Sequence, residues 1–173
     1  MGVELTDEPY EGPVAAALVH ALMRDLNERY AEWAEDWPDE EREQRQASSD
    51  AEYLAEVTAA QVSPPQGAFV VAWLDGEAVA CGALRPAGVD GEGEVKRMYT
   101  VPGARRRGLG ALVLERLEAQ AAELGYRALR LETGTAQPEA IALCEKAGWH
   151  RITSYGRYEG HVASVCLGKV LVR

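Results

Sequence analysis

Residues 94–133 change their hydrophobic period twice, and this change constrains the fold more than any other feature of the chain. Residues 94–101 (EVKRMYTV) are typical of a strand, residues 108–124 carry apolar side chains at helical spacing, and residues 126–133 alternate like a second strand. Gly125 is a natural stop for the helix. A strand–helix–strand unit predicts two parallel strands joined by a right-handed crossover, so we expect an α/β fold.

Further helices and strands are predicted on both sides of this unit. The apolar spacing and the Gly and Pro breaks predict helices over 12–33, 48–60 and from Pro138, a hairpin of strands 68–74 and 77–84 around Asp75-Gly76, and a last strand over 163–171. On the helix over 108–124, the side chains expected on one side are Leu109, Leu112, Val113, Leu117 and Leu124. At 173 residues, with no internal repeat, the chain fits one α/β domain.

The composition argues against several classes of function. The chain holds 18 Lys and Arg against 28 Asp and Glu, and this net charge of −10 disfavours nucleic-acid binding, which usually needs a basic face. The apolar runs are too short to span a membrane, and the N-terminus lacks the pattern of a secretory signal. Cys81, Cys144 and Cys166 form no CxxC pair, so we expect reduced thiols in a cytoplasmic protein, with neither a metal site nor a disulfide framework.

Three arginines and two glycines lie between the first strand of the unit and its helix, in the run ARRRGLGA. A helix N-terminus exposes N–H groups without partners and carries a partial positive charge, and a glycine-containing loop lets an anion come close to them. Arginine side chains at the same place add charge-assisted hydrogen bonds to phosphate. The run therefore predicts a phosphate site. The alternative is an exposed basic turn, although basic residues there oppose the helix dipole.

Two common nucleotide motifs do not match this loop. G-x-G-x-x-G fails because position 113 is Val, and the Gly-Lys-Ser/Thr of the Walker loop is absent. The pattern R-x-x-G-x-G is present as Arg105, Gly108 and Gly110, and it resembles the acyl-CoA pyrophosphate loop of the GNAT superfamily of N-acetyltransferases. The resemblance extends over residues 94–152, including QPEAIALCEKAGW, and the helical arm and hairpin before them also follow the family's plan.

The resemblance implies a fold and an activity for the chain. The expected fold is a single GNAT-like α/β domain: a mixed central sheet with helices on both faces and an N-terminal two-helix arm. Residues 1–66 would hold the arm and the first strand, 67–152 the hairpin and the CoA-binding core, and 153–173 the C-terminal strand region. The implied activity is direct transfer of an acetyl group from acetyl-CoA to a primary amine of a small molecule or peptide, without a metal. Homodimers are common in such families.

The resemblance also assigns residues to the cosubstrate. Backbone N–H groups of the loop would hold the pyrophosphate, and the strand before it would pair with the pantetheine arm. Gln137 stands where relatives often carry an asparagine that touches the pantetheine, although it could equally cap the helix opened by Pro138. The residues implied are Met98, Tyr99, Thr100, Arg105, Arg106, Arg107, Gly108, Leu109, Gly110, Ala111 and Gln137.

Catalytic roles follow in the same way. The backbone N–H of Met98 would polarise the thioester carbonyl, which is usually a large catalytic contribution. Glu94 falls where some relatives carry the glutamate that deprotonates the amine, since an ammonium has no lone pair with which to attack. The alternative is that Glu94 ends a charged turn and points into solvent.

One departure from the family pattern concerns the general acid. Cys144 stands where many relatives have the tyrosine that protonates the leaving thiolate. A thiol can donate a proton, but its side chain is shorter, and the alternative is a small buried packing residue. Tyr99, Tyr155 and Tyr158 are substitutes, and water is another source of the proton.

The acceptor is indicated only weakly. Residues 27–44 contain eight acids, which would attract a cationic amine or simply form a solvated surface. Trp33 and Trp37 would line the acceptor pocket or pack the arm on the sheet. Two rival functions stay open. One is a catalytically weak CoA-binding sensor or structural module with the same fold. The other is a domain that binds an anion other than CoA.

Overall fold

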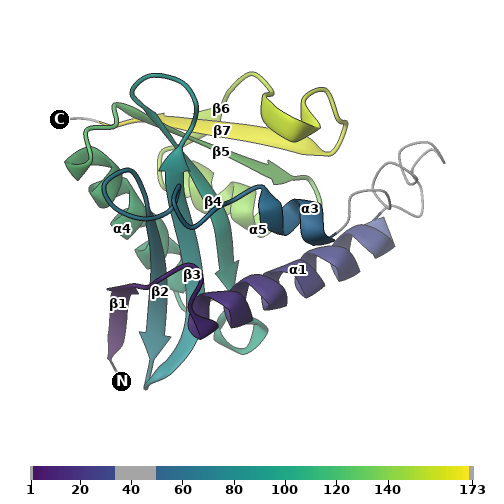
Figure 1. Cartoon of the computed structure of the whole chain (residues 1–173). Helices are drawn as coiled ribbons and strands as arrows, with labels where there is room; N and C mark the ends of the chain where they lie inside the picture. Colours follow the sequence, from purple (N-terminus) through teal and green to yellow (C-terminus); the bar gives the residue numbers. More distant parts are fainter. Residues whose placement is uncertain (1, 34–49, 172–173) are drawn as a thin grey trace.

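The computed structural model describes residues 2–33 and 50–171, and the described strands form one sheet (Figure 1). In chain order the elements are β1 (Val3–Asp7), α1 (Pro13–Trp33), α3 (Asp50–Ala55), β2 (Ala68–Leu74), β3 (Glu77–Pro86), β4 (Glu92–Thr100), η2 (Pro102–Ala104), α4 (Leu109–Glu123), β5 (Ala128–Gly134), α5 (Pro138–Lys146), β6 (His150–Arg151), η3 (Gly156–Tyr158) and β7 (Ser164–Val170).

The seven strands are arranged in the order β1-β2-β3-β4-β5-β7-β6. Every neighbouring pair is antiparallel except β4 and β5, which are parallel and joined through α4. The parallel pair predicted from residues 94–133 is therefore confirmed, and so is the mixed α/β sheet. Figure 1 shows β5 and β7 running at a steep angle to β4, so the sheet opens where its two halves meet.

Helices cover both faces of the sheet, as predicted (Figure 1). On one face, α4 and α5 pack on a core that includes Leu84, Val95 and Leu129. On the other face, α1 and the segment after α3 pack on a second core that includes Phe69 and Val71. The period-2 alternation of the strands supplies both cores, because successive side chains point to opposite faces.

The inward face of α4 was predicted only in part. Leu109, Val113 and Leu117 are fully buried, but Leu112 and Leu124 are each 38% exposed. Leu114 and Ala121 are buried in their place. Leu112 falls on the flank of the helical stripe defined by the buried residues, while Leu124 is the C-cap at the end of the helix.

Two connections show how local sequence sets the fold. Asp75 and Gly76 both have positive φ, 52° and 85°, which confirms the predicted hairpin turn. The helix expected over 48–60 instead ends at Ala55 within the described residues. After the helix the chain forms a separate turn, in which the backbone N–H of Thr58 donates to the side chain of Gln61 at 3.0 Å and the N–H of Gln61 donates to the carbonyl of Thr58.

Candidate active site

The parallel pairing of β4 with β5 ends early. Glu92, Gly93 and Glu94 are opposite Ala128, Leu129 and Arg130, and no described residue of β5 pairs with β4 beyond this point. β5 continues to Gly134 with β7 as its partner. Residues 95–100 of β4, here called the open edge of β4, therefore have backbone groups that can pair with an extended ligand as a strand would.

A bulge lies in the middle of this open edge. The register with β3 runs from Lys96 opposite Ala83 to Tyr99 opposite Cys81, so Arg97 and Met98 together face Gly82. Arg97 has a φ of 57°, and a Cβ at Gly82 would lie 2.6 Å from the Met98 sulfur. A bulge re-aims the groups that follow it, and such bulges are common beside active sites. Met98, whose backbone N–H is predicted to polarise the thioester carbonyl, thus lies in an irregular part of β4.

The loop after β4 ends at the N-terminus of α4. Gly108 is the N-cap residue, with a φ of 81°, and no side chain caps the helix. The N–H groups of the first turn, at Leu109, Gly110 and Ala111, precede the first intrahelical donor, which is the N–H of Leu112. These groups lie beside exposed Arg106 and Arg107. The uncapped, glycine-led helix start fits a pyrophosphate, because its first-turn N–H groups have no intrahelical acceptor and its partial charge is positive.

Arg105 holds the loop in place. Its Nε donates to the carbonyl of Thr100 at 3.0 Å, and its Nη2 donates to Asp25 of α1 at 2.7 Å. Its backbone N–H donates to the carbonyl of Pro102. Arg105 therefore joins the loop, the end of β4 and α1, whereas Arg106 and Arg107 form no ion pair within residues 2–33 and 50–171.

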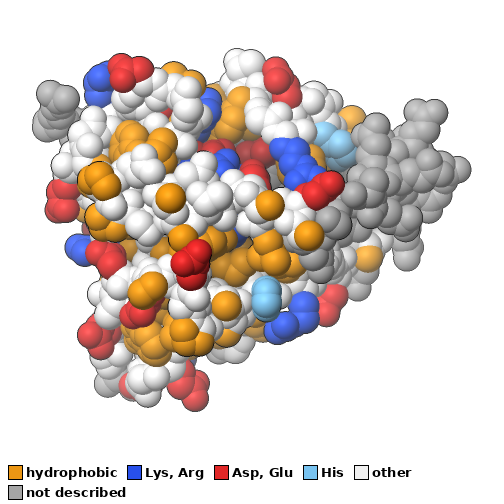
Figure 2. Space-filling model, viewed as in Figure 1, with side chains coloured by type: hydrophobic (Ala, Val, Ile, Leu, Met, Phe, Trp, Pro, Cys, Tyr) orange, Lys and Arg blue, Asp and Glu red, His pale blue; other side chains and the backbone are white. Residues whose placement is uncertain are grey.

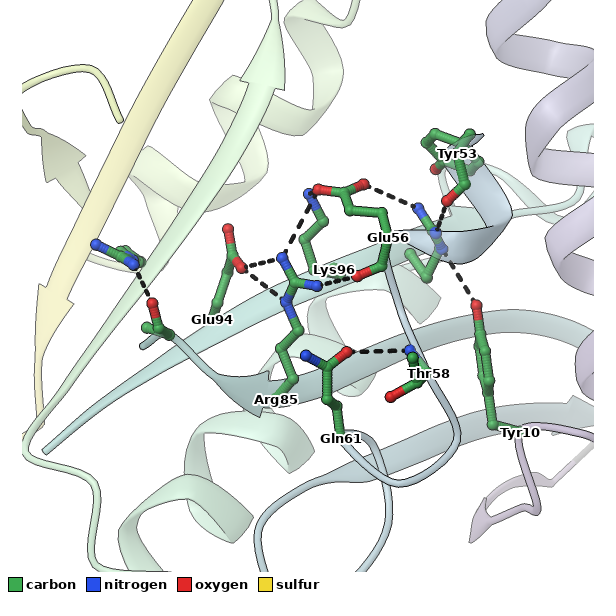
Figure 3. Close-up of polar contacts among 11 residues, drawn as sticks. Tyr10, Tyr53, Glu56, Thr58, Gln61, Arg85, Glu94 and Lys96 are labelled. Carbon is green, nitrogen blue, oxygen red and sulfur yellow. Dashed lines mark hydrogen bonds and ion pairs between the residues drawn. The ribbon is translucent and has the colours of Figure 1, made fainter. Parts of the chain in front are cut away.

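Charged side chains gather on the face of the sheet opposite α4, next to the open edge (Figure 3). Arg85 of β3 lies directly opposite Glu94, and its Nε and Nη2 approach Glu94 Oε2 at 2.8 and 2.7 Å. Glu94 is 5% exposed. The alternative that Glu94 points into solvent is therefore wrong, and its carboxylate is instead half of a largely buried ion pair. Figure 2 shows acidic and basic side chains in a hollow on this side of the molecule.

Glu56, which follows α3, neutralises two further cations of β4. Its Oε1 accepts a hydrogen bond from Lys96 Nζ at 2.6 Å, and its Oε2 lies 3.7 Å from Arg97 Nη1. Burial acts to raise the pKa of Glu56, but the charges of Lys96, Arg97 and Arg85 outweigh it, and the net pKa is lowered. The bulge brings Lys96 and Arg97 to the same face, where the Glu56 carboxylate contacts both.

Arg97 is 4% exposed and is enclosed by aromatic rings as well as by Glu56. Its guanidinium lies 3.8 Å from the centroid of the Tyr53 ring and donates to the Tyr53 carbonyl and to the Tyr10 hydroxyl. Such a cation is fixed in place by stacking and by hydrogen bonds. Arg97 thus fastens the bulge to the helical arm, which in turn fixes the open edge of β4.

Comparisons with known proteins agree with this geometry. Residues 16–149 match the model of the acetyltransferase (GNAT) family. The chain belongs to the GNAT family of acetyltransferases. It is 39% identical over 110 residues, which are 64% of this chain and 72% of the relative, to an IAA acetyltransferase of Azospirillum brasilense. An uncharacterised N-acetyltransferase of Escherichia coli, YjgM, is 34% identical over 58% of this chain and 61% of its own length.

Solved structures share the same GNAT fold. An acyl-CoA N-acyltransferase from Klebsiella pneumoniae superposes with a TM-score of 0.71 at 29% identity, covering 98% of both chains. The PaiA N-acetyltransferase of Thermoplasma acidophilum, solved in complex with coenzyme A, gives a TM-score of 0.69 at 18% identity, covering 98% of this chain and 99% of that one. No helix within the described residues is long and apolar enough to cross a membrane. Nor does any group of His, Cys, Asp and Glu there have a metal-binding arrangement.

The position of Cys144 favours the packing alternative. Its side chain is 2% exposed, within the core beneath α4 and α5. Burial, together with the negative charges of Glu118 and Glu145, raises the pKa of the thiol to about 11. In this GNAT protein the thiol is therefore a neutral core group, and its role as general acid stays a prediction.

The tyrosine substitutes lie in different places. Tyr99 packs in the core beneath α1, and burial raises its pKa. The hydroxyl of Tyr155 is buried, and burial and the nearby Glu94 carboxylate raise its pKa. Arg130 lies over the Tyr155 ring at 4.2 Å. Tyr155 thus belongs to the charged face, while Tyr158 is exposed in η3.

Three predicted residues remain: Gln137, Trp33 and Trp37. Gln137 is the N-cap residue of α5 but makes no capping bond with its side chain, which donates to the Tyr30 hydroxyl at 3.3 Å. Trp33 is the last residue of α1, and Trp37 and most of the acidic run over 27–44 lie outside the described residues.

Sequence reasoning missed three charged residues of this face: Arg85, Glu56 and Glu132. A signal for Arg85 existed, because pairing the strands on either side of the Gly-rich turn places Arg85 opposite Glu94. Glu56 carried no signal, since nothing local indicates that the segment after α3 reaches Lys96.

Proposed function

We propose that this GNAT protein transfers an acetyl group from acetyl-CoA to a primary amine of a small molecule or peptide by direct nucleophilic attack. The observation that carries the proposal is the open edge of β4, which contains a bulge and leads straight to the uncapped N-terminus of α4. One continuous stretch of backbone thus offers strand-like donors for an extended chain and helix-terminal donors for a phosphate.

Acetyl-CoA is the cosubstrate that fits this stretch. The first-turn N–H groups at Leu109, Gly110 and Ala111 would hold the pyrophosphate, with Arg106 and Arg107 adding positive charge. The open edge at Met98, Tyr99 and Thr100 would pair with the pantetheine arm. The PaiA relative, which shares the fold, was solved with coenzyme A. Arg105 contributes by holding the loop against Asp25 rather than by offering a free guanidinium.

The chemistry needs a donor that stabilises the oxyanion. We assign this role to the backbone N–H of Met98, because the bulge at Arg97 and Met98 interrupts the regular register with β3. A fixed N–H aimed at developing negative charge needs no reorganisation during the reaction. Holding the thioester and the amine in the same site adds a further contribution through proximity.

Proton movement completes the reaction. The acceptor must lose a proton to attack, and the site offers carboxylates for this purpose beside the open edge of β4. The role predicted for Glu94 stays a prediction, and its Oε2 is already engaged by Arg85. Proton return to the leaving thiolate could come from water or from Tyr155, whose hydroxyl is buried on the same face.

The proposed acceptor class is a primary amine, in keeping with relatives named as N-acetyltransferases. The relative in Azospirillum brasilense is named an IAA acetyltransferase, so IAA is assayed beside the panel described below. Lining of the acceptor pocket by Trp33 and Trp37, the homodimer and the cytoplasmic location stay predictions.

A thiol-release assay with acetyl-CoA tests the proposal against a panel of polyamines, aminoglycosides, amino acids and peptides. We expect thiol release that depends on an amine. Binding of acetyl-CoA without release for any member of the panel would favour the rival function, a CoA-binding sensor or structural module. Failure to bind acetyl-CoA would contradict the assignment of the loop itself.

A further inference from the structure

Three carboxylates lie on the charged face beside the open edge of β4, and they differ in their partners. Glu94 is paired with Arg85, and Glu56 is paired with Lys96 and Arg97. Glu132 of β5 accepts a hydrogen bond from the hydroxyl of Ser164 at 2.7 Å and forms no ion pair with any residue in 2–33 or 50–171. Of the three carboxylates, Glu132 is therefore the one that forms no ion pair with a cation of the described residues.

The sheet register places Glu132 across the opening from β4. Glu94 and Arg130 are the last paired residues of the two parallel strands. Two residues further along each strand, on the same face, come Lys96 and Glu132, where the pairing has already ended. A Cβ at Gly156 would lie 3.7 Å from Glu132 Oε2, so the carboxylate lies close to the segment at η3, and the charges of Lys96, Glu56 and Glu94 act on it from the same face.

The surroundings of Glu132 favour a carboxyl that can take up a proton. Burial raises its pKa, as do the charges of Glu56 and Glu94, while the Ser164 hydroxyl and the charge of Lys96 act in the opposite direction. The titratable and charged groups around it come from every neighbouring element: Glu94 and Lys96 of β4, Glu56 after α3, Arg130 of β5, Cys166 of β7 and Tyr155 before η3.

We propose that Glu132, rather than Glu94, accepts the proton of the acceptor ammonium. The inference rests on the proposed acetyl transfer. One N–H bond of the ammonium breaks and its proton moves to the Glu132 carboxylate, which gives the nitrogen a lone pair. The nitrogen then bonds to the thioester carbon, and the carbon–sulfur bond breaks with its electron pair on sulfur. The second ammonium proton passes to water, the thiolate takes up one proton, and Glu132 later releases its own proton to solvent.

Protonation would have different consequences for the ion pairs around Glu94 and around Glu132. A proton on Glu94 would remove the nearer of the two carboxylates that face the largely buried Arg85, and the other, Glu56, lies 3.7 Å away. A proton on Glu132 disrupts no ion pair, because its partner Ser164 can donate or accept a hydrogen bond. Among the three carboxylates, Glu132 alone has no cationic partner within the described residues, so the same residue would help to bind a cationic acceptor.

The pH profile of kcat/KM tests the assignment with the best amine of the thiol-release panel. In the wild-type protein, activity falls as the pH drops through the pKa of the base. We expect Glu132→Gln to lower kcat/KM about 100-fold near neutral pH, to lose this acidic limb and to recover as the pH nears the pKa of the amine itself. Glu94→Gln should keep the acidic limb. The exposed Glu115→Gln removes the same charge elsewhere and should change nothing.

Ser164→Ala gives a second readout that does not depend on removing the carboxylate. Its hydroxyl stabilises the charged form of Glu132, so its loss should raise the pKa of that group and move the acidic limb to higher pH. Acetyl-CoA affinity, measured by calorimetry, should be unchanged in both variants, which shows that they are folded.

The outcomes separate the two proposals. An acidic limb that is unchanged in Glu132→Gln, or is lost in Glu94→Gln alone, would overturn the role of Glu132 and leave the transferase in place. A limb that does not move in Ser164→Ala would count against Glu132 in the same way. If the wild-type protein released no thiol with any amine, the transferase proposal would fail and this inference with it.

Discussion

The two sides of the site are built in different ways. The proposed cosubstrate side consists of consecutive residues, from the open edge of β4 through η2 to the first turn of α4, and it would work mainly through backbone N–H groups. The proposed acceptor side is assembled from side chains of β3, β4, β5, β7 and the segment after α3. The first is fixed by local conformation, whereas the second depends on how distant segments pack and neutralise one another.

The largest expected effect lies on the acceptor side. Glu56→Gln would leave Lys96 and Arg97 without their shared carboxylate. We expect the free energy of unfolding to fall by about 3 kcal/mol, because a buried cation without its partner is strongly destabilising. Urea denaturation measures this. Glu145→Gln, at an exposed pair with Arg151, should cost less than about 1 kcal/mol, and equal losses would contradict the account.

The pH dependence of the unfolding free energy tests the same charged cluster around Glu56. The net pKa of Glu56 is lowered in the folded protein, so its contribution to stability is present above the ordinary carboxyl pKa and is lost as the pH falls through the lowered value. The difference in unfolding free energy between the wild type and Glu56→Gln should therefore shrink in acid. A difference that is constant from neutral to strongly acidic pH would show that the charges of this cluster are not coupled to folding.

On the cosubstrate side, we expect substitutions to change the affinity for acetyl-CoA rather than the free energy of unfolding. Gly110→Ala adds a methyl group where the backbone would approach the pyrophosphate, and its carbon would lie 3.3 Å from the Leu143 side chain and 3.7 Å from the Thr100 side chain. We expect acetyl-CoA affinity to fall about tenfold, or about 1.4 kcal/mol. The unfolding free energy should not decrease, since alanine favours a helix. Ala119→Gly, further along α4 and exposed, should weaken stability without changing affinity.

A smaller effect is expected at Cys144. Because the thiol is buried and its pKa is raised to about 11, Cys144→Ala should leave turnover unchanged and cost about 1 kcal/mol of stability through a small cavity. Steady-state kinetics and thermal denaturation of the same preparation measure both. A tenfold or greater loss of kcat with intact stability would restore Cys144 as general acid.

The smallest effect is expected from the exposed arginines. Arg106→Ala and Arg107→Ala together should weaken acetyl-CoA binding a few-fold at low salt, because exposed charges interact weakly and are screened. At high salt the difference should disappear. Calorimetry over a range of salt concentrations measures this. A loss that persisted at high salt would mean that their side chains bind the phosphates directly.

The same contrast explains how much could be predicted from the sequence. The hairpin, the parallel pair and the R-x-x-G-x-G loop follow from neighbouring residues, so they could be predicted. The ion pair of Glu94 with Arg85 required the register of two strands, and the contact of Glu56 with Lys96 required the packing of the arm. Glu132 had no local signal, because its role depends on where β5 leaves β4.

The destination of the acetyl group tests the central claim most directly. The protein is incubated with acetyl-CoA labelled with carbon-13 in the acetyl group and with the best amine, and the products are analysed by mass spectrometry and NMR. The account predicts the label in an amide of the acceptor, in proportion to the thiol released, with none on the protein. Label that stayed on CoA, or that accumulated on the protein, would contradict direct transfer to an amine.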